Sequence, residues 1–410
     1  MKQVWRELLI LIAALILACG SKTTDPDGSN PPETGSFLWL HSEGNKIVDE
    51  EGNIRILRGV NRSGFDYDKS GAGISEDEIA YICSVWKAQI IRLPFNQDWI
   101  MRDPDYIVFF DKIIGWINKN GAYALLDLQW RNTAVKIPPI PDEEAIGMWQ
   151  IIAEKYRDNP GVLYDIHNEP HDTTWQAWRE RASQIIEAIQ SVHPRALIFV
   201  GGMDWAYDLR GWGANPLPYA NVVYSSHPYP FKAEPWAWAK YFGDVADKYP
   251  VFIGEFGGES SHLQWGRELL AFMDDKKLGW TAWSWSNYTY LTQDDRRTPT
   301  EFGQLVLNAL LVHAGQPPAA TLDIDDLRVE NPGSESVTIT WSTGSDADGK
   351  VRYGKTSSYT DSVYAQTMIK VHIIKLYNLE PATLYHFNVA SVDRYGNQAE
   401  TPDSTFTTMP

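Results

Sequence analysis

The sequence of 410 residues is poor in several features that would point to other classes of protein. It has only two cysteines, Cys19 and Cys83, so it has neither a disulfide framework nor a thiol-rich metal site. Its 36 Lys and Arg face 53 Asp and Glu, and the net charge of −17 argues against nucleic-acid binding, because little positive charge remains to displace counterions from phosphates. The apolar run from Leu8 to Leu17 is too short to span a bilayer.

Motifs of several enzyme classes are also missing. No Gly-rich phosphate turn follows any predicted strand, and no Gly-x-Ser-x-Gly nucleophile elbow occurs. The segment from His167 to His171 carries two histidines, but Pro170 between them breaks the helical spacing of a zinc-binding helix. We therefore expect no metal site and no cofactor.

The N-terminus predicts an extracytoplasmic protein. Lys2 and Arg6 precede the apolar run, which ends at Leu17-Ala18-Cys19 and is followed at once by polar residues. This resembles the lipobox of a bacterial lipoprotein, in which Cys19 would be acylated after removal of a signal peptide, residues 1–19. Residues 20–36 are predicted to form a flexible linker. The membrane is then contacted only through a lipid anchor, at a bacterial membrane or cell surface, with ordinary secretion as the alternative.

Residues 37–316 alternate short apolar runs with helical patterns, and this alternation is typical of repeated βα units. Eight units in about 280 residues match the size of a (β/α)8 TIM barrel, an α/β fold. A doubly wound sheet is the weaker alternative, because the phosphate turn is missing. The predicted strands are 54–61, 90–96, 123–130, 162–168, 196–201, 222–229, 251–256 and 279–286. The predicted helices are 75–88, 105–119, 142–157, 174–192, 235–248, 261–276 and 300–313.

After Pro317-Pro318 the composition changes, and residues 320–410 show strand patterns separated by turn clusters. We expect a small all-β immunoglobulin-like sandwich there. The segment from Leu379 to Tyr385 looks like a tyrosine corner. The stretch resembles a fibronectin type III domain, whose expected role is that of a spacer or a contact module.

Two glutamates follow buried strands at matching places. Glu169 lies in Ile166-His167-Asn168-Glu169-Pro170, and Glu255 lies in Phe252-Ile253-Gly254-Glu255. The carboxyl ends of parallel strands form one rim of a barrel, where active sites are built. Two facing carboxyl groups, one protonated and one ionised, are the minimal apparatus for cleaving a glycosidic bond. The 18 Trp and 20 Tyr residues fit this hypothesis, because flat rings stack on sugars, although most aromatic residues fill cores.

Further polar and aromatic residues fall at the same predicted rim, namely Arg92, Asn168, His227, Tyr229 and Trp283. With them the chain resembles glycoside hydrolase family 5, a family of retaining (β/α)8 glycosidases, over about residues 37–315. The resemblance implies that Glu169 is the acid/base and Glu255 the nucleophile. It also implies that Arg92 orients Glu255, Tyr229 donates to it, and Asn168 contacts the sugar 2-hydroxyl. The remaining substrate-binding or supporting candidates are His227, Trp283, Gln129 and Trp130.

The resemblance leaves some points open. Gln129 stands where many relatives have a histidine, which puts some sugar contacts or support of the acid in doubt. Trp205 and Trp212 follow the fifth strand, and either stack on sugars or pack a loop. We predict a monomeric endo-β-1,4-glucanase that acts on a polysaccharide or oligosaccharide, with mannan, xylan or xyloglucan as alternative substrates. A carbohydrate-binding surface lipoprotein without turnover is the alternative of another class.

Overall fold

The computed structural model describes residues 37–232, 234–316, 322–393 and 397–410. Contacts divide the chain into two compact units, with the boundary between Phe302 and Gly303. Among the described residues, no helix combines the length and the apolar character needed to cross a membrane. The predicted signal peptide and linker, with Cys19, lie outside the described residues.

The first unit is a closed barrel of eight parallel strands, which confirms the predicted TIM barrel. The strands follow one another around the barrel in chain order, and β10 closes it by pairing with β3. The strands are β3 (Arg58–Asn61), β4 (Ile90–Asn96), β5 (Tyr123–Trp130), β6 (Val162–Asp165), β7 (Ile198–Gly201), β8 (Val222–Ser226), β9 (Val251–Ile253) and β10 (Gly279–Ala282). Several strands end earlier than predicted, because the chain leaves the ladder just before the residues of the site.

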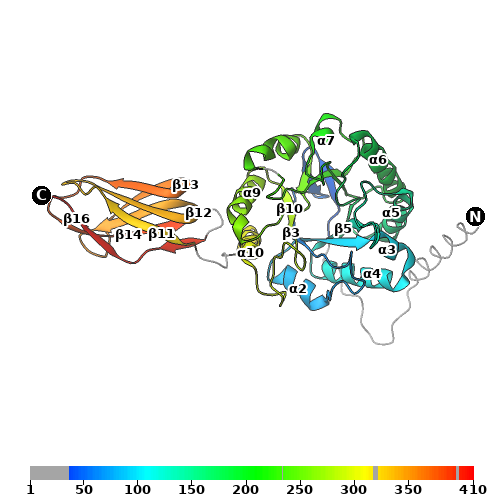
Figure 1. Ribbon diagram of the computed structural model, residues 1–410, viewed down its shortest axis with the longest axis horizontal. Helices are drawn as coiled ribbons and strands as arrows, with labels where there is room; N and C mark the ends of the chain where they lie inside the picture. The colour runs from blue at the N-terminus through cyan, green and yellow to red at the C-terminus, as the bar shows by residue number, and fades with distance from the viewer. Residues whose placement is uncertain (1–36, 233, 317–321, 394–396) are drawn as a thin grey trace, which may run out of the picture. The chain divides into compact units, whose positions relative to one another are not determined.

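Helices surround the strands (Figure 1). The predicted helices occur as α2 (Glu76–Ser84), α4 (Pro104–Lys119), α5 (Glu143–Tyr156), α6 (Trp175–Val192), α9 (Leu263–Asp275) and α10 (Glu301–His313). A short 3₁₀ turn, η3 (Ser260–His262), precedes α9. The predicted helix 235–248 is instead a 3₁₀ turn η1 (Pro235–Ala237), a π turn η2 (Ala239–Gly243) and a single turn α8 (Asp244–Ala246). Two short helices were not predicted, α3 (Gln97–Arg102) and α7 (Arg210–Ala214), because five or six residues are too few to show a helical period.

A hairpin closes the amino-terminal end of the barrel, and it was not predicted either. It consists of β1 (Leu40–Glu43) and β2 (Lys46–Asp49). Its Leu40 and Ile47 belong to one buried cluster with residues near the strand starts, such as Ile90 and Tyr123. Because this cluster fills the amino-terminal end, the opposite rim is left for polar groups.

The second unit contains antiparallel strands, as predicted. The strands are β11 (Ile324–Glu330), β12 (Val337–Gly354), β13 (Asp361–Leu376), β14 (Leu384–Val392), β15 (Gln398–Glu400) and β16 (Ser404–Thr407). Trp341 from the first half of β12 and Val351 from its second half belong to one buried core. The Tyr385 hydroxyl accepts a 3.0 Å hydrogen bond from the Glu380 amide, as in a tyrosine corner.

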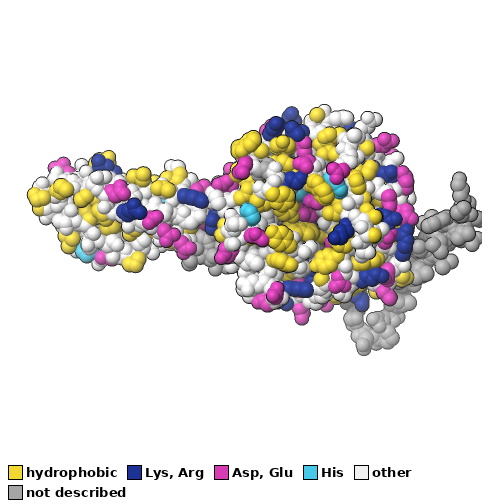
Figure 2. All heavy atoms as spheres, in the orientation of Figure 1, with side chains coloured by type: hydrophobic (Ala, Val, Ile, Leu, Met, Phe, Trp, Pro, Cys, Tyr) yellow, Lys and Arg dark blue, Asp and Glu magenta, His cyan; other side chains and the backbone are white. Residues whose placement is uncertain are grey.

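Charges on the surface are mixed. Figure 2 shows acidic and basic side chains interspersed over the face that it draws, and the described residues on this face form no extended basic patch.

Candidate active site

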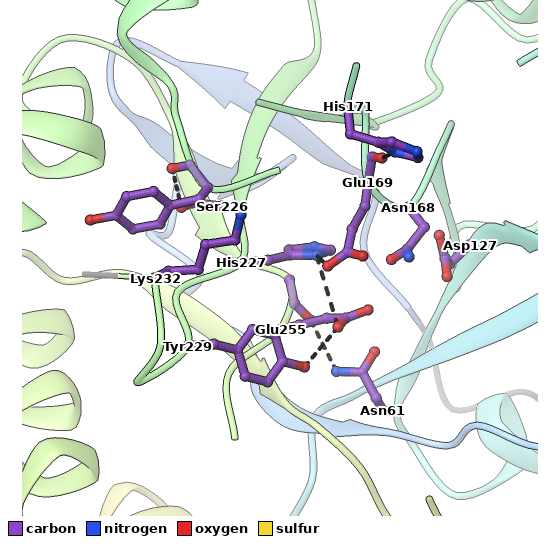
Figure 3. Close-up of polar contacts among 12 residues, drawn as sticks. Asn61, Asp127, Asn168, Glu169, His171, Ser226, His227, Tyr229, Lys232 and Glu255 are labelled. Atoms are coloured by element: carbon purple, nitrogen blue, oxygen red, sulfur yellow. Dashed lines mark hydrogen bonds and ion pairs between the residues drawn. The ribbon is translucent and has the colours of Figure 1, made fainter. Parts of the chain in front are cut away.

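Glu169 and Glu255 meet at the carboxyl-terminal rim of the barrel. Glu169 lies four residues after the end of β6, and Glu255 lies two residues after the end of β9. One oxygen of each carboxyl group and one ring nitrogen of His227 all lie within 4.8 Å of one another. Figure 3 shows the two glutamate side chains converging beside the imidazole. The pairing that the sequence predicts is therefore present.

Arg92 holds the base of the site together. Its side chain on β4 is fully buried, and its Nη1 donates to Glu255 Oε1 at 2.7 Å and to Asn61 Oδ1 at 3.0 Å. Nη2 donates to Asn168 Oδ1 at 2.9 Å, and Nε donates to Asp165 Oδ2 at 2.8 Å. The planar guanidinium therefore binds four side chains from three other strands or the segments that follow them, which fixes the orientation of Glu255.

Tyr229 and His227 follow β8 and face the two glutamates from the same side. The Tyr229 hydroxyl donates to Glu255 Oε2 at 2.9 Å. His227 Nδ1 lies 3.3 Å from Glu169 Oε1 and 3.9 Å from Glu255 Oε2. Burial lowers the pKa of His227 well below its ordinary value, and Arg92 adds to this effect. The imidazole is therefore neutral, and it can donate one hydrogen bond to Glu169.

The two carboxyl groups have different electrostatic surroundings. Burial and the neighbouring Glu255 raise the pKa of Glu169 well above its ordinary value. Burial also raises the pKa of Glu255, to about 7, but Arg92 and the Tyr229 hydrogen bond oppose this increase. Since the two groups interact closely, they titrate as a pair. These surroundings favour the protonated form at Glu169 and the ionised form at Glu255.

A cavity of about 640 Å³ opens above the pair. Five of the residues predicted to bind substrate or act in catalysis lie in its wall, namely Gln129, Glu169, Tyr229, Glu255 and Trp283. The ring of Phe231 also lines this cavity and stacks on Tyr229 at 5.4 Å between centroids. The wall is completed by Pro230, Gly257, Gly258, His262, Tyr288 and Thr289.

Four predicted residues do not line this cavity, namely Arg92 and His227, whose contacts are given above, and Trp130 and Asn168. Trp130 packs near Tyr67, and Lys136 Nζ lies 5.4 Å from its ring centroid. Asn168 is buried beneath the cavity, where its Oδ1 binds Arg92 and its Nδ2 has no partner in the described structure. Trp212 is fully buried and donates to the Gly201 carbonyl, so it packs the fold.

Three buried residues of the site were missed in the sequence, namely Asn61, Asp127 and Asp165. Asn61 at the end of β3 donates to the carbonyls of Gly254 and Thr281. Asp127 and Asp165 are fully or almost fully buried on neighbouring strands and contact Arg92. A charged residue inside an otherwise apolar strand is the signal that could have found both aspartates.

The cluster of Glu169, His227 and Glu255 has ligand atoms close enough together for a metal ion. Its surroundings do not suit one. Arg92 and Tyr229 already bind the two oxygens of Glu255, and the guanidinium places a positive charge where a cation would lie. The residues present therefore fit a proton-transfer site better than a metal centre.

Comparisons with known proteins agree with this geometry. Residues 48–289, more than half of the chain, match the family model described as cellulase (glycosyl hydrolase family 5). Endoglucanase E-5 of Thermobifida fusca is 27% identical over 286 residues, which cover 65% of this chain and 60% of that protein. An endoglucanase of Paenibacillus polymyxa is 28% identical over 316 residues, covering 60% of this chain and 79% of that protein. The chain thus spans less than two thirds of the first of these relatives.

Solved structures show the same fold. The β-glucanase SdGluc5_26A of Saccharophagus degradans superposes with a TM-score of 0.62 at 24% identity, over 71% of this chain and 98% of that one. It has also been solved in complex with cellotetraose. The catalytic domain of Thermobifida fusca endoglucanase Cel5A gives a TM-score of 0.57 at 21% identity, over 69% of this chain and 99% of that one. On the strength of the family match, the chain belongs to the cellulase family, glycosyl hydrolase family 5.

Proposed function

We propose that the protein is a retaining endo-β-1,4-glucanase in which Glu169 is the acid/base and Glu255 the nucleophile. The observation that carries this proposal is the close approach of the two carboxyl groups, with one oxygen of each within 4.8 Å of the other. Retaining glycosidases hold their carboxyl groups about 5–5.5 Å apart, whereas inverting enzymes leave about 6.5–9.5 Å for a water molecule. The spacing therefore favours double displacement through a covalent glycosyl-enzyme.

In the first step the glycosidic C–O bond breaks, and Glu169 gives its proton to the departing oxygen. Glu255 attacks the anomeric carbon and forms an ester with the sugar. The pKa order supports these roles, because the acid must keep its proton while the nucleophile has lost its own. In the second step Glu169 removes a proton from water, which attacks the same carbon and releases Glu255.

The neighbours of Glu255 support its role as nucleophile. Arg92 and Tyr229 each donate to one of its oxygens, so the carboxylate is held in one orientation toward the cavity. His227 lies within hydrogen-bond distance of Glu169, and a neutral imidazole there positions the acid without removing its proton. Asn168 has an unpartnered Nδ2 in the same region, which is suited to a sugar hydroxyl.

The proposed substrate is a β-1,4-glucan. Support comes from the relatives, which are named endoglucanases, and from the β-glucanase of similar fold that was solved with cellotetraose. The aromatic rings of Trp283, Phe231 and Tyr288 in the cavity wall can stack on glucose units.

Reducing-sugar release tests the proposal on carboxymethyl-cellulose, mixed-linkage β-glucan, xyloglucan, mannan and xylan. We expect activity on the β-glucans and its loss in Glu169→Gln and Glu255→Gln, with Glu180→Gln on the exposed side of α6 as the matched control. Proton NMR of the first product should show the β-anomer, as retention requires. Release of the α-anomer, or full turnover in Glu255→Gln, would contradict the mechanism. Activity on mannan, xylan or xyloglucan alone would show that the substrate is that polysaccharide and not a β-1,4-glucan.

We also propose a fibronectin type III-like identity for the C-terminal unit and a lipid anchor at Cys19. The Tyr385–Glu380 hydrogen bond and the shared core of the two halves of β12 support the first proposal. The apolar run that ends at Cys19 supports the second. Fractionation of cells that express the full chain tests the anchor. We expect the protein in the membrane fraction and the Cys19→Ser variant in the soluble fraction, and an unchanged distribution would contradict the proposal.

A further inference from the structure

Arg92 is surrounded by more negative charge than one guanidinium can balance. Asp127, Asp165 and Glu255 each place a carboxyl oxygen 2.7 to 2.9 Å from a guanidinium nitrogen. Their side chains are at most 4% exposed, and that of Arg92 is fully buried. Three ionised carboxylates would leave two net negative charges around one buried guanidinium, which is costly. One of the three groups therefore carries a proton.

The hydrogen bonds of the three carboxyl groups indicate which of them carries the proton. Asp165 receives a hydrogen bond from Arg92 Nε, and Glu255 receives hydrogen bonds from Arg92 and Tyr229. Among the described residues, no donor gives a hydrogen bond to either oxygen of Asp127, although Oδ1 lies 2.9 Å from Arg92 Nη2. An ionised carboxylate without a donor is the least stable of the three, so protonation costs least at Asp127.

A candidate acceptor for the proton lies on the neighbouring strand β6. Asp127 and Asp165 are paired residues in the register of β5 and β6. Asp165 Oδ1 is buried and has no hydrogen-bond partner in the described structure. A protonated Asp127 can donate to this oxygen, so that one proton satisfies an atom of each side chain.

We propose that Asp127 is a positioning residue that stays protonated and donates to Asp165, so that Arg92 balances only Asp165 and Glu255. This role rests on the proposed function, in which Glu255 must be ionised. Were Asp127 also ionised, its charge would oppose the effect of Arg92, and Glu255 would hold its proton more tightly.

The charged groups that face Asp127 come from several elements. They are Arg92 on β4, Asp165 on β6, Glu255 after β9 and Asp66 in the loop after β3. Burial raises the pKa of Asp127 well above its ordinary value, and the three acidic neighbours add to this effect, while Arg92 opposes it. Burial also raises the pKa of Asp66 and of Asp165, each to about 6, so both are ionised above neutral pH when Asp127 is not.

The variants Asp127→Asn and Asp127→Leu test the proposal through the pH profile of kcat/KM. An asparagine amide is neutral and can donate to Asp165, so we expect the acid limb, which reports on Glu255, to stay within about 0.3 pH units of the wild-type position. Leucine has no donor, and we expect that variant to lose kcat and thermal stability that asparagine retains. A shift of the acid limb to lower pH by about one unit in Asp127→Asn would show that a negative charge had been removed, and would overturn the proposal.

A second measurement needs neither a variant nor turnover. In wild-type enzyme with ¹³C-carboxyl-labelled aspartate, we expect at least one aspartyl carboxyl to keep the chemical shift of the protonated form above neutral pH. If every aspartyl carboxyl has the ionised shift, the proposal is wrong. Because this spectrum does not depend on substrate, it separates a failure of this inference from a failure of the proposed glucanase activity.

Discussion

The hydroxyl of Tyr229 donates a 2.9 Å hydrogen bond to Oε2 of Glu255, the oxygen that Arg92 does not bind. Each oxygen of this carboxyl group thus has its own donor, one neutral and one positively charged. Both donors stabilise the ionised form, which is the form that a nucleophile needs.

Removal of the phenolic hydroxyl should make Glu255 a weaker acid. In Tyr229→Phe we expect the acid limb of the kcat/KM profile to move to higher pH and kcat to fall by about tenfold to a hundredfold. Tyr207→Phe is the matched control, because the Tyr207 hydroxyl is buried without a partner in the described structure. An acid limb that moves to lower pH in Tyr229→Phe would contradict the assigned direction of this hydrogen bond.

Arg92 cannot be replaced by lysine, because a single ammonium group cannot reproduce the four hydrogen bonds that the guanidinium donates. In Arg92→Lys we expect kcat to fall by about a hundredfold or more, and the free energy of unfolding to fall by about 3–5 kcal/mol, because buried carboxylates lose their partner. The control is Arg195→Lys, whose surface pair with Glu50 contributes little. Activity assays and denaturant unfolding measure the two effects. An Arg92→Lys variant with near-normal kcat would show that the hydrogen bonds of the guanidinium are not needed for catalysis.

The raised pKa of Glu169 predicts a stability that depends on pH. Since folding raises this pKa, the folded state binds the proton more tightly, and its contribution to stability decreases as pH rises from the ordinary value to the folded one. Glutamine does not titrate. We therefore expect Glu169→Gln to raise Tm relative to wild type at about pH 8 and to raise it less at about pH 5. Scanning calorimetry at both pH values measures this difference. An equal change in Tm at both pH values would contradict the raised pKa of Glu169.

Gln129 should bind substrate through its amide. It lines the cavity, and its Oε1 is buried without a partner in the described structure. In Gln129→Ala we expect kcat/KM on cello-oligosaccharides to fall by about tenfold while the pH profile keeps its shape, because an uncharged contact is lost. The control is Gln150→Ala, whose side chain binds Ser191 at the exposed surface. An altered pH profile would instead indicate that Gln129 positions the acid, Glu169.

The tyrosine corner of the second unit should contribute to its stability. In Tyr385→Phe we expect the free energy of unfolding of this unit to fall by about 1 kcal/mol, since one buried hydrogen bond is lost. Tyr377→Phe is the control, because Tyr377 is largely exposed. Tryptophan fluorescence of Trp341, in the core of this unit, can follow the unfolding if the tryptophans of the barrel are resolved from it in the denaturant curve. Equal stability of the two variants would argue against the corner.

Several features of this protein were readable from local sequence. The order and spacing of the barrel strands follow from apolar runs that alternate with helical periods, and both patterns span only a few residues. The positions of Glu169 and Glu255 follow in the same way, because each comes directly after a buried strand. The β1–β2 hairpin and the short helices α3 and α7 were missed, because segments of four to six residues show too little period to be recognised.

Other features depend on which strands become neighbours. The five partners of Arg92 come from positions between 61 and 255, and their distances depend on closure of the barrel and on the register of its strands. Trp205 and Trp212 look alike in the sequence, but Trp212 is fully buried in the fold whereas Trp205 stacks on His171 at 3.7 Å between centroids. The sequence by itself determined the barrel and its two glutamates. Only the tertiary structure decided burial, pKa order and hydrogen-bond partners, because these quantities depend on contacts between distant residues.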